Sequence, residues 1–179
     1  MGNREALREL QTRLAQRLQT DGADAQAATW LAFECAQQGV VVALPTAGEI
    51  FPLCTLMPVP HTKPWFLGVA NLRGQLHGVV DLAAFLGLRP PLSQEHLRDA
   101  QRTPTRLLAF NPALGSHCAV LIDRLAGLRS ANQLHQAPAQ DENSPLFAPT
   151  QWLDDQGRHW QQLDLRLLAR YEEYLGIAA

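Results

Sequence analysis

The stretch of sequence that decides the fold runs from Gly68 to Leu82 and reads GVANLRGQLHGVVDL. It looks like a pair of buried strands, yet it carries a cation, Arg73, at the turn in its middle. After the turn the chain is extended as far as Val80, and Asp81 is placed to accept hydrogen bonds at the start of a short helix. The stretch therefore predicts strand, turn, strand and helix, and the turn arginine needs a reason.

The composition of the chain excludes several classes of function. The chain has 179 residues, of which 46% are hydrophobic and 18% charged, as in an ordinary globular protein of one domain or two small ones. The formal net charge of -2 gives no overall positive field, so we expect no nucleic-acid partner. Cys35, Cys54 and Cys118 form no C-x-x-C pair, and no run approaches the roughly 20 apolar residues of a membrane span. We expect a cytoplasmic protein without direct membrane insertion.

The first part of the chain changes from a helical to a strand period. Leucines at steps of three, four and four predict an N-terminal amphipathic helix within residues 1–22, followed by a linker over 23–28. From Trp30 the apolar period is two, which predicts a hairpin that ends at Pro45. The short runs Leu53–Met57 and Phe66–Val69 are bounded by prolines, so edges or turns are expected there.

The second half repeats this alternation of short strands and turns. Residues 89–104 hold three prolines and no apolar period, which predicts a long polar loop. Strand signals return from Thr105, and a last hairpin turns at residues 154–157. Asp164 is placed to cap a closing helix that ends at Gly176. About ten short strands with few helices favour small barrels or a sandwich.

No motif for catalysis, metal binding or cofactor binding is present in the sequence. The nearest pair of metal-ligand types, His117 and Cys118, would point to opposite faces of a strand. The chain has no G-x-S-x-G, no P-loop and no G-x-G-x-x-G. The sequence predicts no enzyme, no cofactor, no metal site and no catalytic residue.

The pattern G-x-x-N-x-R-G, followed by a strand, Asp-Leu and a small helix, resembles the CheW-like domain of bacterial chemosensory adaptors. The flanks agree, because Glu49-Ile50 stands where the family has an E-I pair, and the likeness covers Thr29 to Gly176. Lys63-Pro64-Trp65 and the N-terminal helix look more like the PilI-type adaptors of type IV pilus systems. The chain departs from the family at Gly78, where proline is usual, and at Ala47, where a larger aliphatic residue is common.

The resemblance implies a mainly β fold of two intertwined five-stranded SH3-like barrels, with an N-terminal and a C-terminal helix. It implies a CheW-like domain over residues 29–179 that acts as an adaptor or scaffold by protein–protein interaction, in chemotaxis or in type IV pilus twitching motility. The implied partners are a methyl-accepting chemoreceptor and the regulatory domain of a CheA-type histidine kinase, at membrane-associated receptor arrays. The implied partner-binding residues are Ala47, Glu49, Gly68, Asn71, Arg73 and Gly74.

Arg73 has two interpretations in the sequence. It is either a solvated turn residue that pairs locally with Asp81 or Glu49, or a guanidinium presented to a partner by a turn that the neighbouring glycines and Asn71 shape. The family pattern favours the second.

Two other functions remain open from the sequence. One is a small-ligand barrel, a carrier or sensor closed by the strands Val40–Leu44 and Ala119–Ile122. The other is a hydrolase with scattered catalytic residues such as His117 or Asp164. Neither alternative is supported by a motif.

Overall fold

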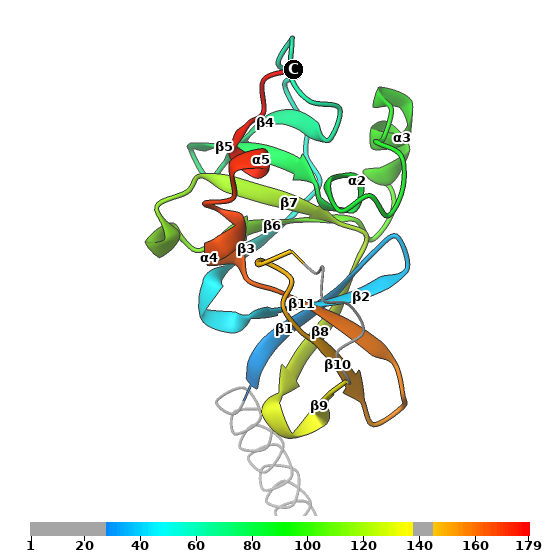
Figure 1. Ribbon diagram of the computed structural model, residues 1–179. Coiled ribbons are helices and arrows are strands. Elements are labelled where there is room, and N and C mark those ends of the chain that lie inside the picture. The colour runs from blue at the N-terminus through cyan, green and yellow to red at the C-terminus, as the bar shows by residue number, and fades with distance from the viewer. Residues whose placement is uncertain (1–27, 138–144) are drawn as a thin grey trace, which may run out of the picture.

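The structure is a computed structural model that describes residues 28–137 and 145–179 (Figure 1). The expected N-terminal helix over 1–22 lies outside the described residues, as does the expected linker over 23–28 except for its last residue. That residue, Ala28, already belongs to the first strand. No helix in the described part of the chain is long and apolar enough to cross a membrane.

Short strands dominate the described residues, and the helices among them are short. In chain order the elements are β1 (Ala28–Cys35), β2 (Gln38–Ala43), β3 (Ala47–Pro52), β4 (Phe66–Leu72), β5 (Gln75–Asp81), α2 (Leu82–Phe85), α3 (Gln94–Ala100), β6 (Arg106–Phe110), β7 (Cys118–Ile122), β8 (Arg124–Ser130), β9 (Leu134–Gln136), β10 (Gln151–Asp154), β11 (His159–Leu163), α4 (Leu165–Leu168) and α5 (Glu172–Leu175).

The strands form two sheets whose chain segments alternate. Sheet A has six strands in the order β8-β1-β2-β11-β10-β9, and sheet B has five in the order β3-β6-β7-β5-β4. The chain leaves sheet A after β2, builds all of sheet B, and returns to sheet A at β8, so the two sheets lie one above the other in Figure 1. The expected mainly β fold is confirmed as two sheets, but sheet B is one continuous segment inserted between β2 and β8 of sheet A, and sheet A has six strands instead of five. Both sheets also keep unpaired end strands within the described residues, unlike closed barrels.

Two expectations about helices are wrong. The expected loop over 89–104 contains α3, which Ser93 caps by accepting from the His96 N–H and which buries Leu97. The single closing helix is divided into α4 and α5, because Tyr171 takes an extended conformation between them. The capping roles of Asp81 and Asp164 are confirmed.

Three groups of buried side chains hold the sheets together. One lies within sheet A around Trp160, one lies within sheet B and includes Leu97 of α3, and the largest lies between the two sheets. The strands of the ligand-barrel hypothesis supply these groups: Val40, Val41 and Val42 have no exposed surface. Burying such a side chain typically contributes about 1.5–3 kcal/mol, so these residues act as core and do not line a ligand chamber.

An aromatic stack closes the core between the sheets. The ring of Tyr174, from α5, lies parallel to Trp65 on one side and Phe110 on the other, at centroid distances of 6.3 and 6.1 Å. The division of the closing helix therefore delivers Tyr174 into this stack. Beyond α5 the chain lies next to the residues that precede β4, where the Lys63 N–H donates a hydrogen bond to Ile177 O at 2.7 Å.

Candidate functional site

The hairpin between β4 and β5 presents Arg73 at its tip. Leu72 pairs with Gln75, which leaves Arg73 and Gly74 as a two-residue loop. Both loop residues have positive φ, 51° and 83°, as a type I′ turn requires. The Asn71 Oδ1 accepts from the Gly74 N–H at 2.8 Å and fixes the loop. A Cβ at Gly74 would meet no atom within 4 Å, so glycine is needed there for its backbone conformation.

Arg73 makes an ion pair with Glu49 of β3. Arg73 Nη2 lies 2.7 Å from Glu49 Oε1, and the two side chains remain 76% and 42% exposed. Since β3 and β4 are opposite end strands of sheet B, this contact joins two edges of a sheet that curves toward itself. The alternative local partner, Asp81, is fully buried and instead binds Arg89 at 2.7 Å.

Gly68 lies away from the loop, and its role is to allow the backbone conformation of β4. It is buried, has a φ of 123°, and lies where β4 is irregular in its pairing with β5. A Cβ at this position would collide with the Met57 carbonyl oxygen. Because residue 68 is a glycine, the backbone of Met57 can approach β4. Met57 and Val69 then exchange two backbone hydrogen bonds, each of 2.8 Å. Any effect of Gly68 on a partner is therefore exerted through the shape of this edge.

The structure separates the six residues that the family pattern selects. Glu49, Asn71, Arg73 and Gly74 are exposed together at the hairpin tip and the facing edge. Ala47 is half-buried at the start of β3, where it pairs with Phe110 and packs against the core between the sheets. The first four residues are therefore the exposed members of the set, Ala47 is partly exposed, and Gly68 is buried.

Sequence reasoning missed the apolar surface beside the hairpin tip. Leu76 is 59% exposed and pairs with Asn71, and Met57 is 52% exposed and bridges to Val69. Paired residues on neighbouring strands share a face, so these side chains flank the tip on the outer face of sheet B. Leu76 stands at an outward-facing strand position two residues after Gly74, and this is the sequence signal that could have indicated the apolar surface. An arginine and exposed aliphatic side chains on one face are typical of protein–protein interfaces.

The residues of the hydrolase hypothesis have structural roles. Asp164 Oδ1 accepts from the N–H groups of Arg166 and Leu167 at the start of α4. His117 lies edge-on to the ring of His77, with centroids 5.7 Å apart. In the described residues no three His, Cys, Asp or Glu side chains are placed to hold a metal ion together.

A cluster of three charged side chains lies elsewhere, between strands of sheet A. Glu34 of β1 accepts from Arg124 Nε at 2.9 Å and from Arg158 Nη2 at 2.6 Å. The hydrogen bond from Arg124, aided by Arg158, outweighs burial and holds the pKa of Glu34 below its ordinary value. This cluster ties β1 to the first residue of β8 and to the turn before β11, so we assign it to folding.

Comparison with known proteins gives one family and two relatives. Residues 29–173 match the model of the CheW-like domain. A protein of Rhizobium etli described as "Probable chemotaxis protein CheW" is 37% identical over 60 residues, which are 34% of this chain and 39% of that protein. The crystal structure of scaffolding protein TtCheW from Thermoanaerobacter tengcongensis superposes with a TM-score of 0.62 at 16% identity, over 79% of this chain and 91% of that chain. The structural likeness concerns the fold alone.

Proposed function

This chain belongs to the CheW-like domain family, and from that membership we propose that it is a non-enzymatic scaffolding adaptor of chemosensory signalling. In this role it couples a methyl-accepting chemoreceptor to the regulatory domain of a CheA-type histidine kinase. It acts in the cytoplasm, at membrane-associated receptor arrays. The related stretch covers 39% of the Rhizobium etli protein, so these partners are part of the proposal.

The observation that carries the proposal is the exposed hairpin tip of Arg73. A tight loop, the Asn71 hydrogen bond and the Glu49 contact together hold a guanidinium in a defined place at the surface. Fixing the side chain before binding lowers the entropic cost of forming an interface. Exposed Leu76 and Met57 supply apolar area on the same face. These are the properties of a docking surface, and they require no bound cofactor.

A type IV pilus output is a narrower proposal that rests on the sequence of residues 63–65 and on the expected N-terminal helix, which lies outside the described residues. In the structure these residues serve the fold: Trp65 packs against Phe85 and Tyr174, and the Lys63 N–H bonds to Ile177 O. Their presence is thus explained by packing. Deleting the gene and scoring twitching against swimming tests the output directly: loss of twitching alone supports a PilI-type role, and loss of swimming alone contradicts it.

The adaptor role is tested by affinity capture from an extract of the native cells with the tagged full chain. We expect a histidine kinase and a chemoreceptor to be recovered together, and Arg73→Glu to recover less of at least one of them. Arg102→Glu, which makes the same charge change at another exposed turn, is the matched control and should recover both. Capture of neither protein by the unaltered chain, while it retains a stoichiometric small molecule, would instead support the ligand carrier.

A further inference from the structure

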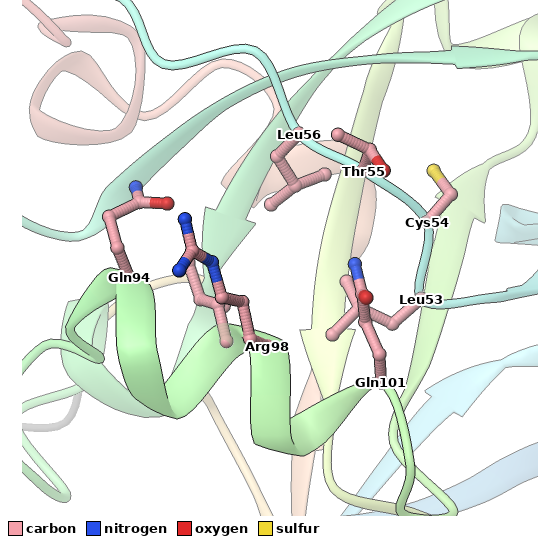
Figure 2. A pocket seen from close by; sticks show the side chains of 8 residues that line it. Leu53, Cys54, Thr55, Leu56, Gln94, Arg98 and Gln101 are labelled. Carbon is pink, nitrogen blue, oxygen red and sulfur yellow. The ribbon is translucent and has the colours of Figure 1, made fainter.

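A cleft lies between α3 and the segment that links β3 to the Met57 bridge. Its volume is about 270 Å³, and Figure 2 shows its two walls. One wall is the segment 53–56, and the other is the face of α3 that carries Gln94, Leu97 and Arg98, together with Gln101 at the C-cap of the helix. We call this site the α3 cleft. Its volume lies just below the usual range of about 300–1,000 Å³ for drug-sized ligands, so it suits a single side chain with neighbouring backbone.

The segment 53–56 offers a free strand edge. It continues β3 beyond Pro52, the last residue paired with β6, and joins no strand before Met57. Leu53 still belongs to the end of the β3–β6 ladder, and within the described residues the backbone N–H and C=O groups of Cys54, Thr55 and Leu56 make no hydrogen bond to the protein. Leu53 is buried, and Cys54 and Leu56 pack against the core of sheet B, so the segment is held in place while its polar groups stay open. An extended peptide can add to such an edge by backbone hydrogen bonds.

The facing wall of the α3 cleft is rich in hydrogen-bond donors. Gln94, Arg98 and Gln101 are four and three residues apart, so they lie along one face of α3, and their side chains rise from the helix toward the segment 53–56 (Figure 2). In the described residues the Arg98 guanidinium makes no ion pair, and none of the three side chains donates a hydrogen bond. No carboxylate lines the cleft. A planar guanidinium between two amides is suited to a carboxylate.

We propose that the α3 cleft binds an extended acidic peptide segment of a partner protein. The peptide backbone pairs with the segment 53–56, and a glutamate or aspartate side chain enters the cleft and is held by Arg98, with Gln94 and Gln101 beside it. This site lies on a different part of sheet B from the Arg73 tip, and it does not depend on the adaptor role. Backbone pairing supplies affinity, and the guanidinium selects the acidic side chain.

The test is an NMR titration of the full chain with the synthetic peptide acetyl-Thr-Val-Glu-Val-Thr-amide. We expect the amide signals of residues 53–56 to shift and their hydrogen exchange to slow. A peptide with Gln in place of Glu should bind about tenfold more weakly or worse, because a charge-assisted hydrogen bond is lost. Arg98→Gln should weaken the Glu peptide by the same factor, and Arg102→Gln, which has the same charge change outside the cleft, should not.

A peptide-side control keeps the test independent of how any variant folds. Methylating the Val, Glu and second Thr amides of the Glu peptide removes strand donors from both of its edges, so this probe should bind at least about tenfold more weakly if backbone pairing holds it. The proposal is overturned if millimolar Glu peptide leaves residues 53–56 unshifted, or if the Glu and Gln peptides bind equally. It is also overturned if sodium acetate reproduces every shift of the peptide without slowing amide exchange, because the cleft would then be a site for small carboxylates only.

Discussion

Replacing Arg73 with Glu should leave the protein folded and remove the proposed partner contact. Coulomb's law gives about 1.5 kcal/mol in bulk water for unit charges at the 2.7 Å that separates Arg73 from Glu49. Both side chains are well exposed to solvent, so we expect the ion pair to contribute about 0.2–1 kcal/mol to the free energy of unfolding, as exposed pairs usually do. With repulsion between the new Glu and Glu49, the total loss of folding free energy should stay below about 2 kcal/mol. An interface arginine can contribute about 2 kcal/mol or more to binding, which is about 30-fold in Kd.

A swapped pair separates the local role of Arg73 from its role in binding. The double variant Glu49→Arg with Arg73→Glu restores opposite charges at the same two positions. If Arg73 only closes the edge of sheet B, the swap should restore both stability and binding. If Arg73 meets the partner, the swap should restore the melting temperature while binding stays at least about tenfold weaker.

The assay combines thermal unfolding with calorimetric titration against the kinase regulatory domain and against the receptor hairpin. Arg102→Glu serves as the control for a general change in charge. The reasoning is refuted if Arg73→Glu binds both partners as tightly as the unaltered chain, or if it does not fold. It is also refuted if the swapped variant regains full affinity.

Three further substitutions test the structure. Gly68→Ala should cost more than about 1 kcal/mol in urea unfolding, because φ is 123° and the new Cβ would meet Met57 O; an unchanged midpoint would show that β4 relaxes freely. The folded-state pKa of Glu34 lies below the ordinary value of 4.5, so its contribution is complete above that pH and is lost as pH falls through the folded pKa. Glu34→Gln should therefore flatten the loss of stability as the pH falls below the ordinary value of 4.5, and an identical acid profile would contradict the assignment. The buried Tyr174 hydroxyl has the Cys118 thiol, a weak hydrogen-bonding group, beside it but makes no hydrogen bond of ordinary geometry in the described residues. Tyr174→Phe should therefore be neutral or stabilising, and a loss above about 1 kcal/mol would contradict this.

Local features of the fold were predictable from the sequence because their causes lie within a few residues. The loop at Arg73-Gly74 and the caps at Asp81 and Asp164 follow from side chains next to the backbone groups that they serve. The joining of six strands into sheet A was not predictable, because the last hairpin is attached by parallel pairing of β11 with β2, more than a hundred residues earlier. The break between α4 and α5 depends on the aromatic stack around Tyr174, whose members come from distant segments.

The sequence predicted which residues belong to the candidate site better than it predicted which of them lie together at the surface. The family pattern selected Arg73 and Glu49, and the structure brings them to 2.7 Å although they lie on opposite edges of sheet B. The pattern could not separate Gly68, which is needed for the approach of Met57, from residues at the surface. It also carried no information about the α3 cleft, because α3 is short and its apolar period is a single buried leucine.

The return of the chain to sheet A at β8 sets an order for synthesis on the ribosome. Sheet B is complete once residue 122 has emerged, because all five of its strands precede that point. β1 and β2 are made first, yet their outer neighbours in sheet A, β8 and β11, do not exist until residues 124–130 and 159–163 follow. An isolated two-stranded hairpin is at best marginally stable in water. β1 and β2 therefore stay without their full set of partner strands, exposed or bound by a chaperone, until almost the last residues are made. Strand pairings of such long sequence separation also form slowly.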